Sequence, residues 1–249
     1  LFGQRLGPEA AYRFAKGEIV ESSGGIPNKI RRPLDFLVVA DHASNMGVMQ
    51  GLEAGDPRLL SSSLGQRMFS QVKEIANSDS KQSAKLSFLL FMDGFQEGSP
   101  ANEQYRQTIW TNAIALADKY NQPGQFTAFI GYEWTQTFYN LHRVVIFKDD
   151  AQKAGQVLPF SQYDSSDPEA LWDYLSNYEE QTAGEVLAIP HNGNLSKGVM
   201  FALEDVRGEP LSADYAKSRS RWEPLFEVTQ VKGDSETHPA ISPTDEFAD

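Results

Sequence analysis

The sequence has no cysteine among its 249 residues, which excludes a disulfide framework and zinc sites built on thiolates. It also has no apolar run near the ~20 residues that a membrane-spanning helix needs, the longest being Phe36–Ala40 and Leu86–Met92. Basic residues are few relative to acidic ones, 22 against 34, which gives a formal net charge of −12. Because so acidic a chain repels phosphate backbones and anionic lipids, we expect no nucleic-acid partner and no membrane partner. The compartment and the oligomeric state stay open.

The motifs of several large enzyme classes are also missing. There is no Gly-x-x-x-x-Gly-Lys-Ser/Thr, no Gly-x-Gly-x-x-Gly, no Gly-x-Ser-x-Gly and no His-Glu-x-x-His. P-loop NTPases, dinucleotide-binding enzymes and serine α/β-hydrolases therefore have no motif support. The composition, 40% apolar and 22% charged, is that of an ordinary globular protein. No shift in composition marks a boundary, so we expect one domain over residues 1–249.

Strand-like and helix-like segments alternate along the chain, which predicts an α/β fold. The short apolar run Leu34–Ala40 contains Val38 and Val39 and predicts a buried strand. A polar linker is expected at Asn77–Lys85. We expect further strands at Phe126–Trp134, His142–Phe147, Val186–Pro190 and Leu225–Val231, and helices at 8–15, Leu64–Ile75, Glu103–Tyr120 and 168–181, the last capped by Asp167.

All four histidines lie at boundaries of the predicted strands. His42 and His191 follow apolar strands, His142 opens one, and His238 comes just after another. Glu133 lies at the end of the strand before His142, so an antiparallel hairpin would bring these two side chains together. In α/β sheets and barrels, residues at the carboxyl ends of the strands converge on the functional face.

Imidazoles and carboxylates at one such edge are the ligands expected for zinc, manganese or iron. Each residue alone has an ordinary structural interpretation, because a single histidine at a strand end is more often a hydrogen-bonding group than a ligand. The joint placement is the more specific signal. It predicts a divalent metal site formed by His42, Glu133, His142 and His191.

The chain resembles the polymerase-and-histidinol-phosphatase (PHP) superfamily over its whole length. The segments that carry the resemblance are Leu37–His42, Gly131–Thr135, Leu141–Arg143 and Ile189–Asn192, which occur in the superfamily's order. The match looks closest to a large bacterial branch of unknown function, in which stretches similar to residues 32–36, 160–161 and 232–236 recur. The resemblance implies a distorted seven-stranded βα barrel, with helices outside and two or three metal ions at the carboxyl rim.

The resemblance also implies a role for each ligand. His42 would bind one metal ion, Glu133 would be a bridging carboxylate, and His142 and His191 would complete a neighbouring site. The opening His-x-His and closing Asp-x-His of the superfamily are absent, and residues 236–238 are the nearest imitation of the latter. We therefore expect an incomplete barrel, a fragment of a longer PHP protein with about half of the metal ligands.

Five further residues are candidates for roles around the metal ions. Lys197 would supply positive charge in catalysis and His238 would be an acid or an extra ligand, with a solvated lysine and a loop histidine as the ordinary alternatives. Substrate would be bound by Asn192, Asn194 and Lys232. Arg143 follows His142 directly, so strand alternation turns it to the opposite face, in a surface or supporting role.

The reaction implied by the resemblance is metal-assisted hydrolysis, in which a hydroxide bridging two metal ions attacks phosphorus. We expect a metal-dependent phosphoesterase acting on a small phosphorylated molecule. Two alternatives remain. One is a metal-dependent hydrolase of amide or ester bonds, because the same nucleophile attacks carbonyl carbon. The other is a non-catalytic binding fragment of a longer PHP protein.

Overall fold

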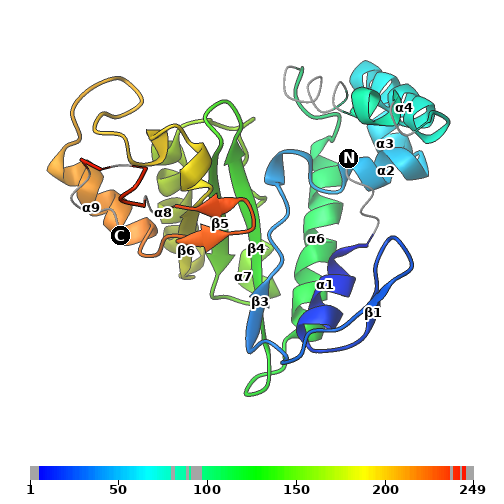
Figure 1. The fold of residues 1–249 in the computed structure, drawn as a ribbon, viewed down its shortest axis with the longest axis horizontal. Coiled ribbons are helices and arrows are strands. Elements are labelled where there is room, and N and C mark those ends of the chain that lie inside the picture. The colour runs from blue at the N-terminus through cyan, green and yellow to red at the C-terminus, as the bar shows by residue number, and fades with distance from the viewer. Residues whose placement is uncertain are drawn as a thin grey trace.

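The computed structural model describes residues 6–79, 82–87, 90, 97–235, 238–241 and 243–244, which form a mixed α/β fold (Figure 1). The central sheet has four strands in the order β3–β4–β5–β6. Strand β4 runs parallel to β3, and β5 runs antiparallel to both β4 and β6. The strands are β3 (Phe36–Val38), β4 (Thr127–Gln136), β5 (Leu141–Phe147) and β6 (Val186–His191), with two small hairpins of β1 (Val20–Glu21) with β2 (Pro27–Asn28) and of β7 (Thr229–Gln230) with β8 (Gly233–Asp234).

Helices precede the sheet, connect its strands and follow it. The longest is α6, which begins after Asn102, whose side chain accepts a hydrogen bond from the Tyr105 N–H at 2.8 Å. The α-helices are α1 (Pro8–Ala15), α2 (Val48–Ala54), α3 (Pro57–Leu60), α4 (Ser63–Ala76), α6 (Glu103–Tyr120), α7 (Ala151–Ala154), α8 (Pro168–Thr182) and α9 (Ala213–Trp222), with short 3-10 turns at Ala43–Asn45, Gly193–Leu195 and Val199–Phe201. None of the described helices combines the length and the apolar character of a membrane span.

Most of the predicted elements are confirmed. Helix α6 has the predicted ends, and Asp167 caps α8 by accepting the Glu169 N–H at 2.9 Å. The central strands β4, β5 and β6 lie within two residues of their predicted limits.

Three predictions were wrong in part. The strand expected at Leu34–Ala40 is reduced to β3, and Phe36 is 64% exposed because β3 is an edge strand with one open face. Residues 82–85 of the expected linker are helical. Of the strand expected at Leu225–Val231, only β7 forms, because the chain turns back at residues 231–232 to pair with β8.

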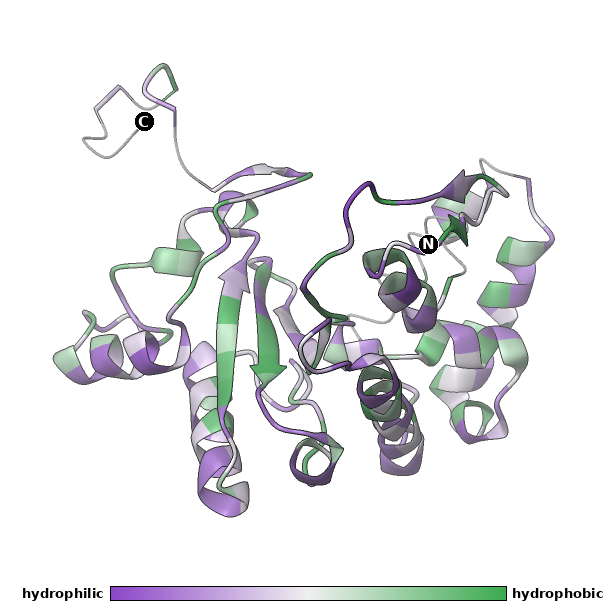
Figure 2. Ribbon diagram, turned by 90° about the horizontal axis from the view of Figure 1, so that it is seen from below, coloured by the Kyte–Doolittle hydropathy of each residue, from purple (hydrophilic) through white to green (hydrophobic). Residues whose placement is uncertain are grey.

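The expected barrel is not present in the described part of the chain. The α/β class is confirmed, but the four strands form an open sheet that does not close on itself. Strand alternation gives this sheet two different faces. On one face, Tyr132 and Phe147 pack against Trp110 of α6, with ring centroids 6.0 Å apart in both pairs, and Phe147 lies 4.8 Å from the ring of Tyr178 in α8. Helices α1, α6 and α8 therefore cover this face in a two-layer arrangement, and the strands are among the most apolar segments in Figure 2.

The other face is open in the described structure. Its aliphatic residues are only half-buried, among them Val144 and Ile146 of β5 and Leu187 and Ile189 of β6. The predicted ligands lie on this same face, where Glu133 and Thr135 alternate with the buried Tyr132 and Trp134. The sheet thus separates an apolar core from a face that carries polar groups.

A second apolar cluster packs against the amino-terminal part of α6. Tyr105 donates its hydroxyl to the Gly47 carbonyl at 2.7 Å, next to the start of α2. A Cβ at Gly51 would lie 2.2 Å from the Tyr105 Oη, so only glycine allows this approach. The cluster consists of Val48, Leu52, Leu59, Met68, Val72, Leu90 and Tyr105.

Arg143 is on the helix side of the sheet, as alternation predicts, but it is a buried ion-pair residue and not a surface one. Its Nε donates to Glu223 Oε1 at 3.0 Å, and the two side chains are 2% and 1% exposed. Glu223 Oε1 also accepts the Trp172 Nε1–H at 2.9 Å, and Arg219 lies 3.1 Å from its second oxygen. This carboxylate ties the end of α9 to the sheet directly behind His142.

We predict that Glu223→Ala destabilises the protein by about 3–5 kcal/mol, because it leaves the buried guanidinium of Arg143 without a counter-charge. Urea denaturation followed by circular dichroism measures the effect. Glu185→Ala is the matched control, since it removes an ion pair with Lys148 in which both side chains are at least 66% exposed, and it should leave stability near wild type. Equal stability of the two variants would contradict the prediction.

Candidate metal centre

Strands β4, β5 and β6 and the segment after β3 deliver the predicted ligands to one place. His42 follows β3 and pairs with Glu133 of β4 as an isolated parallel bridge. His142, near the start of β5, lies directly opposite Thr135 on one side and His191, the last residue of β6, on the other. The antiparallel hairpin that was predicted to bring Glu133 and His142 together is confirmed.

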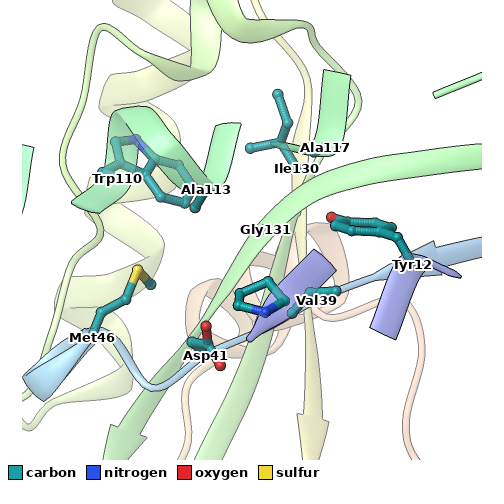
Figure 3. Close-up of a pocket in the computed structure, with 10 residues that line it drawn as sticks. Tyr12, Val39, Asp41, Met46, Trp110, Ala113, Ala117, Ile130 and Gly131 are labelled. Carbon is teal, nitrogen blue, oxygen red and sulfur yellow. The ribbon is translucent and has the colours of Figure 1, made fainter. Parts of the chain in front are cut away.

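The segment after β3 is held in place from the opposite face. Val39 and Asp41 lie on the helix side, near Tyr12, Met46 and Trp110, around a cavity of about 10 Å³ (Figure 3). Such a volume is about that of a single water. The Asp41 carbonyl accepts the Glu133 N–H at 2.9 Å, so the backbone register is fixed. Alternation then turns His42 to the open face beside Glu133.

Two histidines and a hydroxyl surround one oxygen of Glu133. His42 Nδ1 lies 3.2 Å from Glu133 Oε1, and His142 Nδ1 is in close contact with the same oxygen. The ligand atoms of these three residues all lie within 4.8 Å of one another, so the group can hold a metal ion. Thr135 Oγ1 donates to Glu133 Oε1 at 2.7 Å and lies 2.6 Å from His42 Nδ1 and 3.1 Å from His142 Nδ1.

The third histidine faces the other oxygen of the same carboxylate. His191 Nε2 lies 3.0 Å from Glu133 Oε2, and this buried nitrogen makes no hydrogen bond within the described structure. On the far side of the ring, Nδ1 is 3.7 Å from Glu227 Oε2, which accepts the Asn192 N–H at 3.1 Å. The atoms that can hold one metal ion thus include His42 and His142, whereas the resemblance implied that His142 and His191 share a site.

Burial and the neighbouring groups set the charges at this site. Burial alone raises the pKa of Glu133, but the close contacts of its carboxylate with His142 and His191 and the nearby His42 outweigh burial and hold the pKa well below its usual range. Burial lowers the pKa of His142 and prevails over the contrary effect of Glu133. An ionised carboxylate beside a neutral imidazole is the protonation state that binds a metal cation.

The centre opens into a cavity of about 480 Å³. One wall is apolar and comes from the second cluster, with Val48, Met49, Met68 and Leu90. The rest of the lining is polar, with the three histidines, Glu133 and several amide, hydroxyl and ammonium groups. These further polar residues are Ser44, Asn45, Thr135, Thr137, Asn140, Gln162, Asn192 and Lys232.

The structure brings some of the other predicted residues to this cavity and leaves others outside it. Asn192 and Lys232 line it. Asn194 lies next to Lys232 and donates Nδ2 to its carbonyl at 3.4 Å, but is not part of the lining. Lys197 is exposed at a left-handed turn with φ 56°, and His238 is an exposed loop residue whose Nδ1 accepts the Ala240 N–H at 3.1 Å. Neither of them lines the cavity.

Several residues at the site were not singled out from the sequence, among them Thr135, Asn140, Gln162 and Glu227. Thr135 could have been predicted from the sequence, because it is two residues from Glu133 on the same strand and therefore lies on the same face. Asn140, Gln162 and Glu227 carried no such signal, because loops place them. Gln162 accepts from the Thr137 N–H at 3.1 Å, which holds the start of the β4–β5 turn.

The model of one protein family, the proteins of unknown function termed DUF3604, matches residues 1–249. The chain belongs to the DUF3604 family. Comparison with curated proteins and with solved structures found no match. In this DUF3604 chain, the geometry shows that His42, Glu133 and His142 form a group that can hold a metal ion. A third histidine, His191, contacts the same carboxylate.

We predict that Thr135→Val destabilises the metal-free DUF3604 chain by about 1–3 kcal/mol, because buried Glu133 and His142 lose a hydrogen-bond partner at constant side-chain volume. Thr135→Ser keeps the hydroxyl and should recover most of the loss. Urea denaturation in the presence of a chelator measures both variants. If Thr135→Val is as stable as wild type, the hydroxyl is not needed to satisfy these groups.

Proposed function

We propose that this DUF3604 chain is a metal-dependent hydrolase of the PHP type that acts on phosphoric esters. The observation that carries the proposal is the convergence of three imidazoles on both oxygens of one buried carboxylate. His42 and His142 lie at Oε1 of Glu133, and His191 lies at Oε2. A carboxylate approached in this way from both oxygens is suited to bridge two cations.

The donor set fits divalent metal ions. Nitrogen and carboxylate ligands suit zinc, manganese and iron, and the chain has no cysteine that would favour a thiolate site. His191 Nε2 is buried beside Glu133 without a hydrogen-bond partner among the described residues, which is costly unless a cation or proton occupies the position. A bound divalent cation would supply Lewis acidity and make water nucleophilic at neutral pH.

We also propose that the open sheet is part of a distorted PHP barrel. Strands β3, β4 and β6 run in the same direction, with only β5 reversed. Their carboxyl ends carry His42, Glu133 and His191, which is where barrel enzymes place catalytic groups. The half-buried aliphatic residues on the open face correspond to the inward-facing side of such a barrel.

The chain's own residues supply binding and orientation. Lys232 places an ammonium group on the cavity wall, where it can pair with a phosphoryl oxygen. Asn192 donates its backbone N–H to Glu227, and its side-chain amide also lines the cavity. Glu133 and the three histidines would hold the cations and thereby fix the reacting phosphorus relative to these donors. The positive charge of Lys232 favours an anionic phosphoester over a neutral amide or ester.

The metal content of the purified protein tests the centre. Wild-type protein should hold zinc, manganese or iron, and His142→Ala and His191→Ala should each lose most of it, because each removes a ligand. His238→Ala is the matched control, since that histidine is exposed and outside the cavity, and its metal content should equal wild type. Metal-free wild-type protein that stays folded would favour the non-catalytic fragment instead.

A substrate panel tests the reaction class. We expect metal-dependent hydrolysis of phosphate monoesters or diesters, with KM raised severalfold in Lys232→Ala because a charged partner of the phosphate is lost. Steady-state kinetics with phosphate esters, carboxylic esters and amides measure this. Hydrolysis of amides or carboxylic esters alone, with unchanged KM in Lys232→Ala, would support the alternative hydrolase.

A further inference from the structure

We propose that Asn140 is a positioning residue that fixes the tautomer of His142 and thereby makes its Nδ1 available to a metal ion. This inference rests on the metal centre proposed above. It concerns the turn between β4 and β5, which none of the sequence motifs includes. The observation behind it is the contact of Asn140 Oδ1 with His142 Nε2 at 2.9 Å.

The chemistry of the two atoms decides the tautomer. A carboxamide oxygen only accepts hydrogen bonds, so the ring nitrogen that faces it must carry the proton. In a neutral imidazole the other nitrogen then has a free lone pair. For His142 that nitrogen is Nδ1, which points at Glu133 Oε1 and Thr135 Oγ1. The same carboxylate oxygen also has His42 Nδ1 at 3.2 Å.

With this tautomer, hydrogen-bond acceptors face one another at the centre. The lone pair of His142 Nδ1 faces a carboxylate oxygen, and Thr135 has a single hydroxyl proton to share among its three neighbours. Facing acceptors repel one another unless a cation lies among them. Metal-binding histidines in proteins commonly donate their other N–H to a carboxylate or carbonyl oxygen, which fixes the ring for the metal. Asn140 supplies such an oxygen here.

The backbone shows why asparagine suits this position. Asn140 has φ 54°, in the left-handed region that asparagine, aspartate and glycine tolerate best. Its N–H donates to the Thr137 carbonyl at 3.2 Å, and this turn contact does not involve the side chain. Asn140, in this left-handed conformation, closes the turn two positions before His142. Its side chain is thereby directed toward the imidazole ring of His142. A glycine would form the same turn without the amide oxygen.

Because glycine can form the same turn, the role of Asn140 in the turn can be separated from the role of its side-chain oxygen. Asn140→Gly keeps the turn and removes the oxygen, whereas Asn140→Asp keeps both the turn and an oxygen that accepts the Nε2–H. A purely structural role in the turn predicts that both variants behave as wild type. The proposal predicts that Zn²⁺ affinity falls about 10–100-fold in Asn140→Gly and is retained in Asn140→Asp. Ala183→Gly, at the exposed left-handed end of α8 with φ 50°, is the matched control and should bind Zn²⁺ as wild type does.

The experiment is competition of each purified full chain with a fluorescent chelator for Zn²⁺, with thermal unfolding to confirm that each variant is folded. Wild-type protein that takes up no Zn²⁺ overturns the metal centre itself. If wild-type protein binds Zn²⁺ and folded Asn140→Gly binds it with equal or higher affinity, only the role of Asn140 is overturned. Equal weakening in Asn140→Gly and Asn140→Asp also overturns it, because the oxygen is then not the feature that matters.

A second measurement does not depend on metal. Long-range ¹H–¹⁵N spectra of the metal-free protein report which ring nitrogen of each histidine is protonated, and the His142 signals are assigned by their absence in His142→Ala. We expect the Nε2–H form in wild type and in Asn140→Asp, and a loss of that preference in Asn140→Gly. An Nδ1–H form in wild type would mean that the amide nitrogen, not the oxygen, faces the ring, and would overturn the inference.

Discussion

The geometry of the site depends on one buried carboxylate. Glu133 is 7% exposed, and its two oxygens are contacted by His42 from the segment after β3, His142 from β5 and His191 from β6. An ionised carboxylate at such a depth is costly unless it is compensated. The histidines around it supply that compensation, and they hold the pKa of Glu133 well below its usual range. An ionised carboxylate surrounded by imidazole nitrogens can hold a metal ion, so the candidate metal centre depends on Glu133 rather than on any one histidine.

The sheet makes this burial possible by keeping its two faces distinct. Tyr132 and Trp134, the neighbours of Glu133 in β4, are fully buried against the helices, so β4 cannot shift by one residue without exposing both of them. The apolar core therefore fixes which face Glu133 occupies. Arg143 contributes in the same way from β5, because its buried contact with Glu223 holds His142 on the opposite, open face.

Local pattern was enough to predict the elements and much of the centre. Apolar spacing and the breakers at residues 122–124 gave the bounds of α6, and the hairpin argument brought Glu133 and His142 together. What the pattern could not supply was the packing on each face. The run at Leu34–Ala40 looks like a buried strand, but burial depends on what covers the second face, and that face of β3 is open.

The residues placed by loops show the same limit at the site. Lys197 and His238 were expected near the metal ions because they follow predicted strands, yet chain proximity to a strand end does not set the direction of a loop side chain. Asn140 is the converse case. It lies in a turn without any motif, and only its left-handed backbone returns its amide to His142.

The charges that line the cavity indicate an order of binding events. The described residues of the lining include one carboxylate, Glu133, and one ammonium group, Lys232, in a protein whose net charge is −12. One ammonium group offsets one carboxylate, so the cavity without a cation offers no net attraction to an anion. Two divalent ions on Glu133 would reverse this potential and make the same cavity strongly attractive to a phosphoryl group. Under the proposed function, a phosphoester substrate would therefore bind after the metal ions, and Asn140, through its proposed effect on His142, would also influence whether the cavity can recruit an anionic substrate.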